Sequence, residues 1–277
     1  MIVFLDVETT GLNPRADRLV LVGFDGGGGP VFGRHSADRD LIQGFLDLDA
    51  TFVGHNVNFD MHWLEASGYR IPSPERWRDT QLLAHVAGID GERKGGNTAL
   101  ASLTKRLIAA GELPEGILEP EAAIKRWLLG ARRAARKEGR RRPEKGDAPA
   151  PLLRSYLAAD LTCTRAVARH YGAALNGQAN VLELERRCAP AVYAAERRGA
   201  PIDITAAEAV IEQSTAKLGD LEARLHHAAG QPFNLNSAAQ IEHALLGRGV
   251  DLSGARRTPT GKLQTLPMRW SRSATSS

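Results

Sequence analysis

The hydrophobic pattern of the first twelve residues, MIVFLDVETTGL, predicts a buried β-strand. Apolar residues run from Ile2 to Leu5, and Gly11 ends the pattern with a turn signal. Because side chains alternate along a strand, Asp6 and Glu8 fall on the same face. Two ionised carboxylates on a central strand need a cation or hydrogen bonds to compensate them, and their oxygens suit Mg²⁺ or Mn²⁺. The alternative, a solvated turn at a sheet edge, stays open.

The pattern that follows alternates between strand and helix signals. Strands are expected at 19–24 and around 31–32, on either side of a glycine run, and again at 51–53. Apolar residues at helical spacing predict helices, which cover residues 38–47, 59–67, 79–86, 97–107 and 152–171. A meander followed by alternating strands and helices predicts an α/β domain with a mixed sheet.

Two acidic residues occupy informative positions on these helices. Asp79 precedes Thr80 at a predicted helix start, where an N-cap is the commoner role for an acid, so we leave it out of the candidate site. Asp160 follows Tyr156 by four residues on one helix, which holds the phenol and the carboxylate side by side. Such a pair is often only a structural hydrogen bond, and a catalytic role depends on what lies nearby.

The segment 125–145 is strongly basic. It contains ten Lys or Arg residues against two Glu, with Trp127 near its start. A solvated helix and loop is one interpretation. The other is a surface that binds the phosphates of a nucleic acid, which the neighbouring aromatic residue favours.

The remainder of the chain is predicted to be helical. Helices are expected at 181–198, ended by Gly199, at 205–229, ended by Gly230, and from a cap at Asn236 or Ser237 to residue 246. The second of these carries an apolar stripe, made of Val210, Ile211, Leu218, Leu221 and Leu225.

Composition and charge narrow the possible classes. The 277 residues are 43% hydrophobic and 25% charged, enough for one large domain or for a domain and a smaller one. The net charge of +4 permits binding to a polyanion. Cys163 and Cys188 have no CxxC spacing, which excludes a disulfide framework and a cysteine zinc site. No stretch approaches the ~18 apolar residues of a membrane span, so we expect a cytoplasmic protein without a membrane partner.

Three segments, taken together, resemble the motifs of a known enzyme superfamily. DVETTGL (6–12), GHNVNFD (54–60) and YLAAD (156–160) stand in the order and approximate separation of the three motifs of the DEDD superfamily of 3′ to 5′ exonucleases. The resemblance covers residues 1 to about 175. It is of the tyrosine type, because the histidine type has its base five residues before the last acid, where this chain has Ser155. It implies a ribonuclease H-like mixed sheet with flanking helices.

The resemblance also implies phosphodiester hydrolysis with two Mg²⁺ (or Mn²⁺) ions, which together activate water and stabilise the leaving 3′-oxygen. By similarity, Asp6 bridges both ions, Glu8 and Asp160 complete the tighter site, and Asp60 holds the second ion largely through its water shell. Tyr156 orients the attacking water, because a phenol with a pKa near 10 is a poor base at neutral pH. The expected product is a nucleoside 5′-monophosphate.

Three more residues of these motifs are expected to bind the substrate. Thr9 and Leu12 follow the first acid pair, and Asn56 precedes Asp60 in the second motif. Leu12 would wedge against the terminal base, and Asn56 would hydrogen-bond the substrate. Plain packing for Leu12 and a helix cap for Asn56 are the alternatives, and both stay open.

The downstream sequence is similar to the start of the polymerase region of family A DNA polymerases. The similar segments are ERRGAPID, AAGQPFNLNSAAQI and RTPTGKLQT within residues 181–265, which would form a partial, all-α, thumb-like region. The palm acids and the fingers helix of that family are missing, so the chain should not polymerise alone. Residues 266–277 are Ser-rich, and we expect a disordered tail.

Three hypotheses follow from these observations. The first is a proofreading-type 3′ to 5′ exonuclease acting on a single-stranded or frayed DNA 3′ end, in a bacterial or phage-infected cell and associated with the nucleoid. The second is an exoribonuclease of the same superfamily. The third is a non-catalytic DNA-binding subunit that serves a separate polymerase chain with palm and fingers, against which the complete set of five site residues argues.

Overall fold

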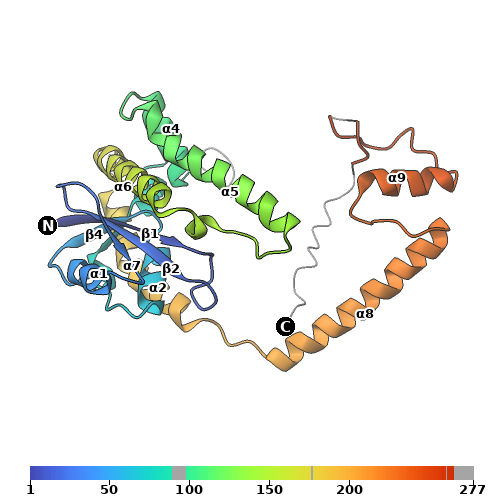
Figure 1. The fold of residues 1–277 in the computed structure, drawn as a ribbon, viewed down its shortest axis with the longest axis horizontal. Coiled ribbons are helices and arrows are strands. Elements are labelled where there is room, and N and C mark those ends of the chain that lie inside the picture. Colours follow the sequence, from blue (N-terminus) through green and yellow to red (C-terminus); the bar gives the residue numbers. More distant parts are fainter. Residues whose placement is uncertain (89–97, 176, 260, 265–277) are drawn as a thin grey trace. The chain divides into compact units, whose positions relative to one another are not determined.

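The computed structural model describes residues 1–88, 98–175, 177–259 and 261–264 (Figure 1). It divides into two compact units, Met1–Gly199 and Ala200–Ser277. The first unit contains a mixed β-sheet with helices on both of its faces, and the second is helical. Within the described segments, no helix is long and apolar enough to cross a membrane.

The sheet has β1 (Ile2–Thr9) at its centre, in the strand order β3-β2-β1-β4-β5. On one side, β2 (Leu19–Asp25) and β3 (Val31–Arg34) continue it as the predicted antiparallel meander. On the other side, β4 (Thr51–Gly54) and β5 (Trp77–Asp79) run parallel to β1 and to each other. The sequence pattern did not predict β5, because three residues are too few to show an alternation.

Apart from the helix at 119–137, the helices of the first unit lie where the apolar spacing predicts them, with small shifts at their ends. For the basic segment 125–145, a solvated helix and loop is one of two interpretations, and the helix covers its first part. The bounds of these helices are α1 Arg39–Leu46, α2 Val57–Ala66, α3 Thr80–Val86, α4 Leu100–Ala109, α5 Glu119–Lys137, α6 Ala150–Ala173 and α7 Ala179–Arg198. Short 3-10 helices lie at η1 Pro74–Arg76, η3 Glu115–Leu118 and η4 Lys145–Asp147. α2 begins two residues earlier than predicted. α4 begins at Leu100, while residue 97 lies outside the described residues.

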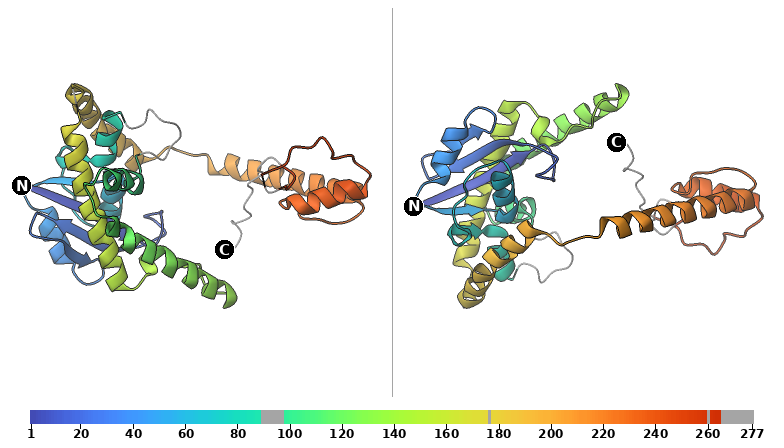
Figure 2. Two further views of the ribbon diagram at one scale, coloured as in Figure 1. Left: turned by 90° about the horizontal axis from the view of Figure 1, so that it is seen from above. Right: turned by 90° about the horizontal axis from the view of Figure 1, so that it is seen from below.

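The alternation along β1 separates an apolar face from an acidic face. Val3, Leu5 and Val7 are buried in a core that includes apolar residues of α1 and α2. Asp6 and Glu8 point to the opposite face of the sheet. The helix α6 covers that face (Figures 1 and 2). The predicted shared face of the two acids is therefore the face against the longest helix of the first unit.

A glycine in β2 sets the distance between the sheet and α6. Gly23 lies opposite Asp6 in the β1–β2 ladder. A Cβ atom at Gly23 would lie 2.8 Å from Cγ of Leu157, a fully buried residue of α6. The missing side chain lets α6 lie close to the sheet, and this brings Tyr156 and Asp160 towards the acids of β1.

The helix α7 packs within the first unit. Tyr193 is buried, stacks on His62 of α2 with ring centroids 4.5 Å apart, and donates a hydrogen bond to Glu65 at 2.9 Å. Glu196 accepts a hydrogen bond from the side-chain amide of Asn58 at 2.9 Å. From the sequence we expect the first domain to end near residue 175 and this helix to belong to the thumb-like region. Its contacts place it in the first compact unit.

The second unit contains α8 (Ile204–Ala229) and α9 (Ala238–Gly247), both of which were predicted. Asp203 caps α8, Gly230 ends it with φ of 75°, and the Ser237 side chain caps α9. The apolar stripe of α8 is exposed in this unit, and its side chains are Val210, Ile211, Leu218, Leu221 and Leu225. The predicted tail at 266–277 lies outside the described residues.

Candidate active site

Three carboxylates from two elements converge at one place. Asp6 and Glu8 come from β1 and Asp160 comes from α6, and one oxygen of each lies within 4.8 Å of the other two. Glu8 has no exposed surface, whereas Asp6 and Asp160 are half-buried. Residues more than 150 positions apart in the sequence thus form one acidic cluster, which we call the carboxylate cluster.

Asp60 lies next to this cluster without belonging to it. It is 2% exposed in the first turn of α2, and its Oδ1 accepts a hydrogen bond from the Val7 amide at 3.1 Å. That bond holds the carboxylate against β1 beside Asp6, whose charge helps to raise the pKa of Asp60. The structure therefore brings three of the four predicted acids into one group and places the fourth at its edge.

Burial makes the ionised forms of these acids costly. It raises the pKa of Asp6 to about 6 and that of Glu8 to about 7, although Lys145 opposes both shifts. Burial and then the charge of Asp6 hold the pKa values of Asp60 and Asp160 well above their usual range. Carboxylates in such surroundings stay charged only when cations join them.

The carboxylate cluster fits a divalent cation. Both carboxylate oxygens of Glu8 are buried and have no hydrogen-bond partner among the described residues, which is costly for polar atoms unless a ligand meets them. All three side chains offer hard oxygen ligands, the type that Mg²⁺ and Mn²⁺ prefer. Asp6, Glu8 and Asp160 are thus the residues that could hold such an ion.

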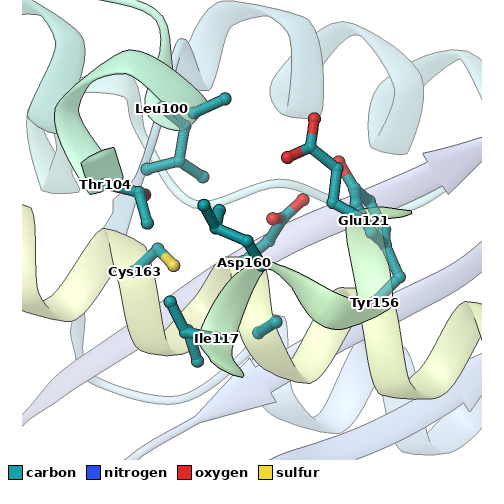
Figure 3. Close-up of a pocket in the computed structure, with 10 residues that line it drawn as sticks. Leu100, Thr104, Ile117, Glu121, Tyr156, Asp160 and Cys163 are labelled. Carbon is teal, nitrogen blue, oxygen red and sulfur yellow. The ribbon is translucent and has the colours of Figure 1, made fainter. Parts of the chain in front are cut away.

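Tyr156 lies beside Asp160 as the four-residue spacing predicts. Burial, the charge of Asp160 and a hydrogen bond between the two side chains raise the pKa of the phenol, so it stays protonated. Both residues line a cavity of about 60 Å³, which also meets Glu121 of α5 and residues of α4 and η3 (Figure 3). A cavity of that size has room for a few water molecules.

Lys145 is a charged residue of this site that the sequence analysis did not single out. Its Nζ lies 2.9 Å from Oε2 of Glu8 and 4.5 Å from the ring centroid of Tyr156. Burial alone would lower the pKa of Lys145, but Glu8 and Asp6 outweigh it and raise that pKa. In the sequence, Lys145 is only the last of ten basic residues, and nothing in the pattern separates it from the other nine.

The three residues expected to bind substrate differ in their surroundings. Thr9 is buried, and its hydroxyl donates a hydrogen bond to the Gly11 carbonyl at 2.7 Å, so it holds the turn after β1. Leu12 is 84% exposed, which excludes the packing alternative. Asn56 occupies the N-cap position of α2 with φ of 65°, yet its side chain makes no capping hydrogen bond. The side chains of Leu12 and Asn56 are thus left available to another molecule.

Asp79 caps two helices. Its carboxylate accepts hydrogen bonds from the Gln81 amide at the start of α3, as predicted, at 2.8 Å. It also accepts from the amides of Asn56 and Val57 at the start of α2, at 2.9 and 3.2 Å. This second cap explains why α2 begins earlier than its apolar pattern predicts.

The basic segment divides into paired and exposed residues. Arg132 pairs with Glu144 at 2.5 Å, and Arg141 pairs with Asp147 at 2.6 Å. Arg133 and Arg136 are exposed on α5, and the described part of the chain provides no ion-pair partner for either of them. Within the basic segment, a polyanion would therefore meet free guanidinium groups on α5.

Comparisons with known proteins relate the chain to a polymerase in sequence and to nucleases in fold. No family model matches it. It is 28% identical over 262 residues to the DNA polymerase DpoZ of Vibrio phage phiVC8, an alignment that covers 85% of this chain and 38% of that relative. The chain thus spans well under half the length of this curated relative.

Two solved structures share the fold. NrnC of Brucella melitensis with bound Mg²⁺ has a TM-score of 0.51 and 18% identity, over 73% of this chain and 89% of that one. The POL domain of Pol1 from M. smegmatis, in complex with DNA primer-template and dNTP, has a TM-score of 0.53 and 14% identity, over 95% of this chain and 40% of that one. The predicted fold class is confirmed: a ribonuclease H-like mixed sheet with flanking helices, followed by a helical C-terminal part.

Proposed function

We propose that the protein is a divalent-metal-dependent 3′ to 5′ exonuclease that releases nucleoside 5′-monophosphates from DNA 3′ ends. The observation that carries this proposal is the convergence of Asp6, Glu8 and Asp160 within 4.8 Å, beside Tyr156. A buried acidic cluster of this kind has no evident structural benefit, because its members raise one another's pKa values. It is explained by a cation that the acids hold during a reaction.

Each side chain has a distinct task in this proposal. Divalent ions held by Asp6, Glu8 and Asp160 would supply charge neutralisation at the phosphoryl group and lower the pKa of a water molecule. Asp60 would hold a second ion through its water shell. Tyr156 stays protonated and donates its hydrogen bond to Asp160, so it can orient a water but cannot take its proton. Leu12 and Asn56 would contact the terminal nucleotide.

The comparisons support DNA as the substrate. The curated relative is a phage DNA polymerase, and one structure with the same fold is a polymerase domain in complex with DNA primer-template. We therefore propose a proofreading role, in which a frayed 3′ end enters the site. An exoribonuclease is the second candidate, because metal-assisted hydrolysis does not depend on the 2′-hydroxyl. Matched DNA and RNA oligonucleotides, degraded in parallel, decide between the two.

The direct test is Mg²⁺-dependent shortening of a 5′-labelled single-stranded oligonucleotide. The wild-type protein should produce a ladder that shortens from the 3′ end, and Asp6→Ala should abolish it without unfolding the protein. Asp40→Ala, which removes an exposed acid of α1, is the matched control and should leave the rate unchanged. Equal rates for wild type and Asp6→Ala would refute the site, and absence of activity in the wild type would favour the non-catalytic hypothesis.

We also propose that the chain works with a polymerase palm and fingers, on the same or on a separate chain. The exposed apolar stripe of α8 and the short coverage of the curated relative support this. The nucleotide sequence that follows codon 277 provides the test. Palm and fingers motifs are expected in the same frame, in another frame or in a neighbouring gene, and a genome without them contradicts this partnership.

A further inference from the structure

Lys145 meets the carboxylate cluster at Glu8 and lies in a turn whose conformation is set by other side chains. It begins η4, in which Glu144 and Asp147 form a capping box around the turn. The ion pairs with Arg132 and Arg141 fasten these two acids to the neighbouring chain. The turn therefore has a fixed conformation, set by four side chains other than Lys145 itself.

Gly146, the residue after Lys145, packs this turn against β1, the strand that carries Asp6 and Glu8. Gly146 is buried, and a Cβ atom there would lie 2.4 Å from the carbonyl oxygen of Thr9 and 2.9 Å from the Thr10 amide nitrogen. Only glycine permits so close an approach. Because Thr9 directly follows Glu8 in β1, this backbone contact sets the position of Lys145 relative to Glu8.

We propose that Lys145 is a positioning residue of the active site, which pairs with one oxygen of Glu8 and leaves the other oxygen for the cation. This inference rests on the proposed metal-dependent function. The ammonium forms an ion pair with Oε2 of Glu8 at 2.9 Å, and within the described segments neither oxygen of this carboxylate has a hydrogen-bond partner. A carboxylate held in this way can offer a divalent ion a single oxygen and cannot chelate it with both.

The removal of this ammonium has two opposite consequences. A positive charge in contact with a ligand of a divalent ion would repel that ion and weaken its binding by about tenfold, even at the dielectric constant of water. Removing Lys145 also lets the pKa values of Asp6 and Glu8 rise, so the comparison belongs at a pH where both acids are ionised. There the repulsion disappears and Glu8 is free to bind the ion with both oxygens, so metal binding should tighten. The same freedom takes the carboxylate out of its productive orientation, so turnover should slow.

The test is Lys145→Met, with Mn²⁺ binding measured by the electron paramagnetic resonance signal of the free ion, alongside exonuclease kinetics. We expect Mn²⁺ to bind about tenfold more tightly and kcat to fall about ten- to a hundredfold, with the KM for the oligonucleotide changed less than about threefold. Lys145→Arg restores the charge and should return Mn²⁺ affinity to within about threefold of wild type. Lys105→Met, at an exposed lysine of α4, is the matched control.

Two results would overturn the inference. Unchanged Mn²⁺ affinity in Lys145→Met would show that the ammonium does not act on the cation site. Weaker Mn²⁺ binding together with a lower melting temperature, not restored by Lys145→Arg, would show that Lys145 only fastens the turn. The Mn²⁺ titration needs no substrate, so its result does not depend on the proposed exonuclease activity. The proposed function fails instead if Asp6→Ala leaves the exonuclease rate unchanged.

Discussion

The burial of Glu8 predicts that removing its charge stabilises the metal-free protein. The folded state raises the pKa of Glu8 from 4.5 to about 7, so above pH 7 ionised Glu8 costs roughly 3 kcal/mol at about 1.4 kcal/mol per pKa unit. Glu8→Gln avoids this cost but leaves a buried amide short of partners, at about 1–2 kcal/mol. We expect a net gain in the free energy of unfolding of about 1–2 kcal/mol at pH 8 in EDTA, with loss of exonuclease activity.

The pH and the metal change this gain in opposite ways. Below about pH 4.5, Glu8 is protonated in both the folded and the unfolded state, so only the cost of the buried amide remains and the variant should be about 1–2 kcal/mol less stable than wild type. The cost in the wild type appears as pH rises from 4.5, because the unfolded state ionises first, and it is complete above about pH 7. Millimolar Mg²⁺ should stabilise the wild type more than the variant, because the variant has lost a ligand.

Thermal unfolding followed by tryptophan fluorescence is a suitable assay, because Trp63, Trp77 and Trp127 lie in the first unit. Each kcal/mol should shift the melting temperature by roughly 2–4 °C. Glu185→Gln, at an exposed position of α7, is the matched control and should shift it little. A Glu8→Gln variant that is less stable than wild type at pH 8 in EDTA, or a difference that does not vary with pH, refutes the reasoning.

Three other perturbations test the site and its scaffold. Tyr156→Phe removes only the hydroxyl and should lower the single-turnover rate constant of hydrolysis by ~10² or more. An unchanged rate constant would mean that Tyr156 only packs in the core. Gly23→Val should push Leu157 and α6 from the sheet, with a loss of roughly 2 kcal/mol or more in chemical denaturation and of activity; a fully stable variant contradicts this account of the spacing. Neutralising Arg133 and Arg136 together should reduce the salt dependence of single-stranded DNA binding, so that the slope of log K against log[salt] is shallower by about 1.4. An unchanged slope would mean that these two side chains do not contact DNA phosphates.

Matched variants separate these effects from general damage. Gly26→Val adds the same side chain where no atom lies within 4 Å, and it should leave stability and activity near wild type. Arg34→Gln with Arg70→Gln also removes two charges, but each arginine is already paired with an aspartate. This double variant should change the salt slope less than the change on α5.

The sequence predicts most of the fold because its elements are long and strongly patterned. The alternation in β1 was enough to place Asp6 and Glu8 on one face, and glycines at 199 and 230 mark the ends of their helices. It could not show β5, whose three residues are defined by pairing with β4 rather than by a local pattern. It also could not show the second capping role of Asp79, which depends on the parallel pairing of Gly54 with Asp79.

The residues of the candidate site also fall into two groups, those that the sequence pattern predicts and those that it does not. Carboxylates on regular elements are predictable, because a strand or helix period fixes where their side chains point. Lys145 is not, because it reaches Glu8 from an irregular segment whose path is set by the contact between Gly146 and Thr9. The exposure of Leu12 likewise depends on the conformation of a turn and not on hydrophobicity.

The packing of α7 also has a practical consequence for dissecting the protein. A chain shortened after residue 175 would lose Tyr193 and expose the surfaces of His62 and Glu65 that it contacts. Such a fragment should aggregate or unfold at a lower temperature than the longer chain. A chain that continues to Gly199 retains that side chain. Residues 200–203, which follow it, form neither helix nor strand and connect it to α8. Limited proteolysis of the intact protein should find this stretch first, and the larger fragment it releases would be the natural choice for crystallisation.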